Sequence, residues 1–262
     1  MDYFEKIEKK PKEELTWNIP EKKSGSVNVI GGNSKSFKTE VKVAEFLGEK
    51  YPIENLKLVL PDALKNQLPP LPNFSFLEST DSGSFKNEKE LAGVFNLADF
   101  NLVLGDLSKN AITGKALADA YHDTKKPILL TRDAVDIFVE NRPEYNLMNE
   151  NLIYFASMAQ LQKLLRAVYY PKMLLLSQSL VQVVEVLHKF TLSYPVSIMT
   201  LHNEQILIAK NGKVKGIMLA SSGYSPIMFF QGELAAKIVA LNLFNPNNFI
   251  DASVSAVFSV DA

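Results

Sequence analysis

The chain has 262 residues, of which 47% are hydrophobic and 22% are charged, and its formal net charge is −1. This composition fits one large α/β domain with a sizeable core, and it lacks the clustered lysine and arginine that nucleic-acid binding needs. No cysteine is present, which excludes disulfides, thiolate zinc sites and cysteine nucleophiles. The three histidines show no metal-ligand spacing, so no metal site is expected.

The first 26 residues are polar, and we expect them to form a tail or an edge element ahead of a single domain over residues 27–262. The start of the chain is too charged for a secretory signal. The longest uncharged apolar run, residues 173–184, is shorter than the roughly 20 residues that span a membrane. We therefore expect a cytoplasmic protein without a membrane segment.

Apolar strands and helical segments alternate in the first half of the chain, which predicts βαβ units and a mainly parallel sheet. Strands are expected at 27–30, 56–60, 100–105 and 126–131, and helices near 38–49 and in KELAGVFN, TGKALADAYHD and AVDIFVE. Residues 68–87 read as a loop. The strands at 27–30, 102–104 and 128–130 should be parallel neighbours, which would place Gly31, Gly105 and Thr131 along one edge of the sheet.

The second half predicts a strand at 151–157, helices over MAQLQKLLRAV and about 175–190, and a last helix at 231–244. Asn211-Gly212 lies between two alternating runs and is a strong signal for a type I′ hairpin. The fold class that follows is α/β: a three-layer sandwich with a mainly parallel central sheet, helices on both faces and a late antiparallel hairpin.

The stretch GGNSKSFKT, residues 31–39, joins the first strand of the domain to its first helix. From Gly32 it differs by one residue from the phosphate-binding loop G-x-x-x-x-G-K-[ST], in which Lys38 and Thr39 would contact nucleotide. Phe37 stands where that loop needs a glycine to wrap around phosphate. We interpret the stretch as a glycine turn that either contacts a ligand or serves geometry alone, with a phosphate-loop NTPase as an alternative.

The order of these segments resembles that of the ADP/ATP-dependent NAD(P)H-hydrate dehydratases, which belong to the ribokinase-like superfamily. The resemblance covers about residues 25–260. The Gly-Gly-Ser turn of that family is similar to Gly31-Gly32-Asn33. Its Gly-Pro-Gly-Leu-Gly turn keeps Gly105, and its Asp-Ala-Asp-Ala-Leu motif keeps Asp133. The resemblance implies a ribokinase-like fold.

Other family motifs are altered in this sequence. Ser157 stands where the family has histidine, and His202-Asn203 stand where it has lysine and glycine. The Gly-Thr-Gly-Asp helix start, which holds phosphate and supplies the catalytic base, falls on Phe230, Gln231, Gly232 and Glu233. Phe230 adds bulk at a position where bare backbone lets phosphate approach, and glutamate moves the carboxylate by about one methylene.

The resemblance implies ADP or ATP, with magnesium, and a nicotinamide-type small molecule as ligands. Glu233 would be the catalytic base. The implied nucleotide-binding residues are His202, Asn203, Glu204, Gln231 and Gly232. The implied substrate-binding residues are Gly31, Gly32, Asn33, Thr39, Gly105, Asp106, Asp133 and Ser157.

Three functions remain open from the sequence. The first is a relative of this family with altered or lost catalysis that still binds nucleotide. The second is an active dehydratase or carbohydrate-type small-molecule kinase that uses Glu233, and the third is the phosphate-loop NTPase. Simpler interpretations stand beside them: Glu233 as a first-turn acid that favours the helix dipole, and His202 as a solvated turn residue. The apolar run at 173–184 and the pair Phe229-Phe230 also predict a homo-oligomer with these segments near its interface.

Overall fold

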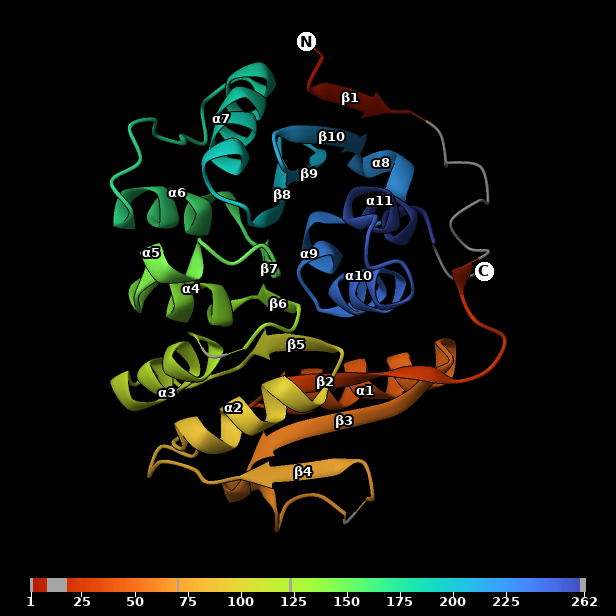
Figure 1. Ribbon diagram of the computed structural model, residues 1–262, viewed down its shortest axis with the longest axis vertical. Coiled ribbons are helices and arrows are strands. Elements are labelled where there is room, and N and C mark those ends of the chain that lie inside the picture. The colour runs from red at the N-terminus through yellow and green to blue at the C-terminus, as the bar shows by residue number, and fades with distance from the viewer. Residues whose placement is uncertain (1, 9–17, 70, 123, 260–262) are drawn as a thin grey trace.

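A computed structural model describes residues 2–8, 18–69, 71–122 and 124–259 of the chain. Residues 9–17 of the expected N-terminal tail lie outside the described residues. Figure 1 shows a central sheet with a layer of helices on each side.

The sheet has ten strands in the order β1-β10-β9-β8-β7-β6-β5-β2-β3-β4. The strands are β1 (Phe4–Ile7), β2 (Ser24–Gly31), β3 (Ile53–Pro61), β4 (Phe74–Leu77), β5 (Phe100–Gly105), β6 (Ile128–Thr131), β7 (Leu152–Phe155), β8 (Ser197–His202), β9 (Gln205–Lys210) and β10 (Lys213–Met218). Among these strands, β9 alone runs antiparallel to the rest. The central strands β5 and β6 are buried along their whole length, as expected of a parallel sheet covered on both sides.

The helices divide between two apolar layers. They are α1 (Lys38–Lys50), α2 (Glu88–Leu97), α3 (Ala111–His122), α4 (Asp133–Glu140), α5 (Pro143–Asn146), α6 (Met158–Ala167), α7 (Leu180–Ser193), α8 (Leu219–Ser222), α9 (Pro226–Phe229), α10 (Glu233–Phe244) and α11 (Phe249–Phe258). α2, α3, α4, α6 and α7 bury their apolar faces in one layer, and α1, α10 and α11 bury theirs in the other. Within the described residues, none of these helices combines the length and the apolar character needed to cross a bilayer.

The strands expected at 27–30, 102–104 and 128–130 are parallel neighbours, as predicted, because β2 pairs with β5 and β5 pairs with β6. The hairpin at Asn211-Gly212 is also confirmed, since both residues have positive φ (50° and 75°). Other predictions were wrong. Strand β4 forms within residues 68–87, which were expected to be a loop, and α7 begins at Leu180 rather than near 175.

The segments expected at an oligomer interface differ in their exposure. Phe229 is fully buried and stacks on Phe155 with a centroid distance of 4.7 Å, so it belongs to the core and offers no docking surface. By contrast, Met173, Leu176 and Val181 are exposed before and within the start of α7, with Leu176 at 69%.

The homo-oligomer therefore stays a prediction, now centred on Leu176. We expect light scattering at micromolar concentration to give a mass above that of one chain, and Leu176→Glu to reduce it, because a charge placed in an apolar interface must be desolvated. Leu97→Glu, at an equally exposed leucine on α2, is the matched control and should leave the mass unchanged. A monomeric wild-type protein would contradict the prediction.

Candidate functional site

The site expected from the sequence lies at the carboxyl edge of the sheet. Gly31 at the end of β2 faces Gly105 at the end of β5, and Gly32 N donates a hydrogen bond to Gly105 O at 2.9 Å. Thr131 ends β6 on the other side of β5. The three strand ends thus meet at one edge, where ligands of such sheets bind.

The glycine turn after β2 is held together by hydrogen bonds among its own residues. Asn33 and Ser36 exchange backbone hydrogen bonds at 2.8 and 3.1 Å, and the Asn33 side chain accepts from Lys35 N at 2.9 Å. The Asn33 amide also donates to the carbonyl of Asp106, which ties this turn to the one after β5. Because these N–H groups are used within the turn, the geometry gives no support to a phosphate-loop site at Lys38 and Thr39.

The turns after β5 and β6 are joined by an ion pair. The Arg132 guanidinium donates to both carboxylate oxygens of Asp106, at 2.7 and 3.1 Å. Both residues have positive φ (56° and 52°), an uncommon conformation for residues other than glycine. The Asp106 carboxylate is thus held by the protein itself.

Two carboxyl groups fill the spaces that the edge glycines leave open. A Cβ built on Gly31 would stand 2.9 Å from Glu40 Oε1, and one built on Gly105 would stand 2.2 Å from Asp133 Oδ1. Asp133 also accepts a hydrogen bond from Leu107 N at 3.0 Å. Burial, followed by the nearby Asp106 charge, raises the pKa of Asp133 above its ordinary value.

Glu40 is the residue that the sequence analysis missed. It lies in the first turn of α1, it is fully buried, and neither of its carboxyl oxygens has a hydrogen-bond partner. Burial, reinforced by the charge of Asp106, raises its pKa to about 8. The sequence did contain a signal for this burial. Glu40 lies three, four and seven residues before Val43, Ala44 and Leu47, which is the spacing of one buried helix face.

The candidate base Glu233 begins α10 and is paired with a buried lysine. Glu233 Oε1 lies 3.0 Å from Lys237 Nζ, one turn along the helix. The Lys237 side chain is only 2% exposed, and it also donates to Ser259 O at 2.8 Å. Burial works to lower the pKa of Lys237, but hydrogen bonds to Tyr224 and Glu233 outweigh it, so that the pKa lies above its ordinary value.

The helix start that the resemblance assigns to phosphate is the start of α10. Its N-cap Gly232 has φ 105° and no side-chain cap, so the N–H groups of the first turn are available. Beside it, Phe230 packs edge-on against Phe155 with a centroid distance of 5.9 Å. Gln231 is exposed next to this turn.

The interpretation of His202 as a solvated turn residue was wrong. His202 is 3% exposed, and its Nε2 lies 2.9 Å from the carbonyl oxygen of Gln178, ahead of α7. Asn203 and Glu204 form the exposed β8–β9 turn with positive φ (45° and 58°). In the structure His202 therefore ties the end of β8 to the segment before α7.

Ser157 caps a helix. Its hydroxyl accepts from Gln160 N at 3.3 Å, and the Gln160 side chain accepts from Ser157 N at 3.0 Å. Gln160 also donates to Arg132 O at 2.6 Å, which ties α6 to the turn after β6. Over the ranges that the structure describes, no group of three or more histidine, aspartate or glutamate side chains is arranged to hold a metal ion.

No family model matches the sequence, and no curated protein matches it. Solved structures do share the fold. Hypothetic protein SMU.573 from Streptococcus mutans has a TM-score of 0.65 at 14% identity, covering 95% of this chain and 87% of that one. YxkO from Bacillus subtilis, a member of the UPF0031 family, has a TM-score of 0.57 at 14% identity, covering 94% and 84%.

An ADP complex of Bacillus subtilis pyridoxal kinase has a TM-score of 0.51 at 11% identity, covering 88% of each chain. At these identities the similarities show the fold. The chain has the ribokinase-like α/β three-layer fold, with a mostly parallel central sheet and a late antiparallel hairpin, as the sequence predicted.

Proposed function

We propose that this protein binds a small polar molecule at the carboxyl edge of its sheet and that its catalysis is altered or lost relative to the hydrate dehydratases it resembles. The observation that carries this proposal is the Glu233–Lys237 ion pair at 3.0 Å. A general base must accept a proton from its substrate at hydrogen-bond distance, and here a Glu233 carboxylate oxygen is already directed at Lys237. Asp106 is similarly held by Arg132.

Nucleotide binding is part of the proposal, in a weakened form. The uncapped first turn of α10 fits a phosphate group, because its N–H groups and the helix dipole favour an anion. Two features oppose tight binding. Phe230 occupies the place of a family glycine, and His202, which stands in the place of the family lysine, is buried against Gln178. ADP or ATP, with magnesium, would bind at Gly232 and Gln231 without a lysine contact.

A small-molecule kinase is the second candidate. Glu233 supports it, because its side chain remains 45% exposed despite the pairing with Lys237 and can therefore reach a ligand. The similarity to pyridoxal kinase in fold is consistent with this candidate. In it, Glu233 would accept the proton of a substrate hydroxyl during phosphoryl transfer.

We expect no detectable dehydration of hydrated NADH or NADPH by the wild-type protein with ADP or ATP and magnesium. Loss of one charge-assisted phosphate contact weakens nucleotide binding by about 1.5–3 kcal/mol, which is roughly one to two decades of affinity. The assay follows the near-ultraviolet absorbance of the reduced nicotinamide, and a thermal-shift series with ADP, ATP, AMP and NADPH reports binding separately.

Two results would change the assignment. Turnover at an ordinary enzyme rate that Glu233→Gln abolishes would show an active dehydratase. Consumption of ATP that depends on pyridoxal or a sugar, and on Glu233, would favour the kinase. Glu45→Gln is the control, because it removes one carboxylate at an exposed position of α1, and it should leave either activity unchanged.

A further inference from the structure

A cavity of about 220 Å³ lies at the amino edge of the sheet, opposite the edge that carries Gly31, Gly105 and Thr131. It is lined by the starts of β5, β6 and β7, the end of β9, and the corner between α10 and α11. Its apolar walls are Phe100, Pro127, Ile153, Leu243, Pro246 and Phe249. Mostly apolar walls with a few polar groups are typical of small-molecule sites.

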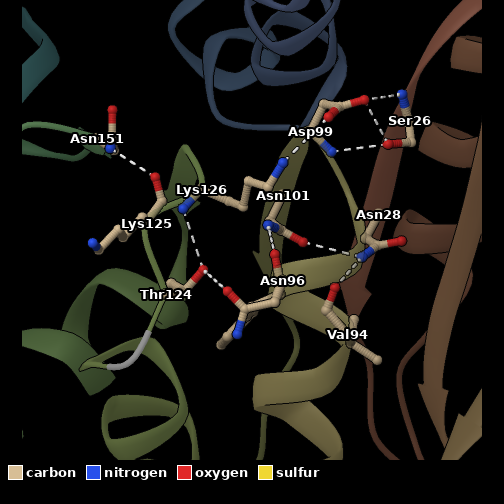
Figure 2. A network of polar contacts seen from close by, with 11 residues as sticks. Ser26, Asn28, Val94, Asn96, Asp99, Asn101, Thr124, Lys125, Lys126 and Asn151 are labelled. Atoms are coloured by element: carbon tan, nitrogen blue, oxygen red, sulfur yellow. Dashed lines mark hydrogen bonds and ion pairs between the residues drawn. The ribbon is translucent and has the colours of Figure 1, made fainter.

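The polar rim of this cavity is fixed by hydrogen bonds (Figure 2). The Asp99 carboxylate accepts from the Ser26 hydroxyl at 2.8 Å and from Lys126 at 3.3 Å. The Asn151 amide donates to Lys125 O at 2.8 Å. The hydrogen bonds of Asp99 and Asn151 are therefore made within the protein, and these bonds fix the position of both side chains at the rim of the cavity.

Two charged groups that line the cavity are not satisfied in this way. Lys210 ends β9, and its ammonium lies 5.4 Å from the centre of the Phe249 ring. Glu150 lies just before β7. Within the described part of the chain, neither side chain makes an ion pair or a hydrogen bond. Burial lowers the pKa of Lys210, and the charge of Glu150 opposes this effect, so the two groups interact across the cavity without closing onto each other.

We propose that this cavity binds an α-amino acid with an apolar side chain, whose carboxylate pairs with Lys210 and whose ammonium pairs with Glu150. A zwitterion fits better than a simple anion, because the cavity presents one unpaired charge of each sign. Its volume equals that of about seven water molecules, which limits the ligand to a small one. The apolar side chain would lie against Phe100, Leu243 and Pro246.

This site is independent of the proposed nucleotide site, because the two lie at opposite ends of the same strands. Binding at the amino edge therefore requires neither ADP nor a functional Glu233. A failure of the function proposed above would leave this inference standing, and the reverse also holds.

Isothermal titration calorimetry with the full chain tests the inference. The ligands are L-leucine and its two halves, 4-methylpentanoate without the ammonium and 3-methylbutylamine without the carboxylate. We expect saturable binding of L-leucine at one site per chain and binding of each half-ligand that is at least roughly tenfold weaker, since each lacks one charge-assisted contact. Equal binding of 4-methylpentanoate and L-leucine would overturn the zwitterion assignment.

Variants locate the binding. Lys210→Met and Glu150→Gln should each weaken L-leucine binding at least roughly tenfold. Lys213→Met is the matched control, because it removes the same charge from an exposed residue of the same hairpin that does not line this cavity. Glu150 is exposed, so its variant tests the proposal even if Lys210→Met folds poorly. No saturable heat with the wild-type protein, or equal affinity in all variants, would overturn the proposal.

Discussion

Replacing Glu40 by glutamine is expected to raise the free energy of unfolding at about pH 8 by on the order of 4 kcal/mol. The Glu40 carboxyl is fully buried and has no hydrogen-bond partner for either oxygen. Burial first, and then the Asp106 charge, raises its pKa from 4.5 to about 8. The folded protein therefore holds a proton that the unfolded chain releases.

The sign of the pH dependence follows from this difference. The stability contributed by protonated Glu40 is fully present below about pH 4.5 and is lost as the pH rises through about 8, because the unfolded state binds fewer protons over this window. Glutamine has nearly the same shape and no charge to desolvate. The difference in the free energy of unfolding between Glu40→Gln and the wild type should therefore be small at low pH and should increase as the pH rises.

Denaturant unfolding at a series of pH values between about 5 and 8.5 measures the effect. Glu45→Gln is the matched control, since it makes the same change at an exposed position of α1, and it should shift stability by less than about 0.5 kcal/mol at every pH. Parallel pH profiles for the wild type and Glu40→Gln would show that Glu40 is already ionised in the folded protein.

Gly105→Ala is expected to destabilise the protein by about 2–5 kcal/mol, from backbone strain and overpacking together. Gly105 has φ 115°, a conformation that residues with a side chain rarely adopt. A methyl group there would lie 2.2 Å from Asp133 Oδ1 and 3.3 Å from the Asp133 backbone nitrogen. Rotation of Asp133 alone relieves only the first contact.

Gly93→Ala is the contrasting variant, and thermal and denaturant unfolding compare the two. Gly93 lies inside α2, and a Cβ there would meet nothing within 4 Å. Alanine should therefore stabilise the protein by about 0.5–1 kcal/mol through its better helix propensity. Equal changes in stability for the two substitutions would contradict the idea that the missing side chain of Gly105 leaves room for the Asp133 carboxyl.

Much of the fold was predictable, because the local sequence pattern of the central strands is enough to identify them as strands. Residues 27–30 and 100–104 are mostly apolar runs, each with one asparagine, and a glycine follows each run. Asn211-Gly212 encodes its own turn. β4 and α11 were missed for physical reasons. Residues 74–77 are surrounded by proline and turn-forming residues, so only pairing with β3 makes them a strand. α11 is apolar on most of its surface, and its N-cap residue Asn248 makes no side-chain capping hydrogen bond.

The meeting of the three strand ends was predictable, but the contacts of the side chains around them were not. Gly31, Gly105 and Thr131 meet at one edge because parallel strands end on the same side. The partners of the charged groups depend on distances that no local pattern encodes. His202 looked like part of an exposed turn, yet it is buried against Gln178. Glu40 was not singled out from the sequence, because an acid in the first turn of a helix is common for electrostatic reasons alone.

The position of β1 has a consequence for the order in which the chain folds. β1 pairs with β10, at the far end of the sheet from β4, and its Glu5 contacts Lys215 at 3.3 Å. Seven strand spacings separate β1 from β2, which is roughly 34 Å. At ordinary rates of translation, about 10–40 s pass between synthesis of residues 4–7 and of their partners at 213–218. An early strand must therefore stay unpaired on the ribosome until one of the last strands has been made.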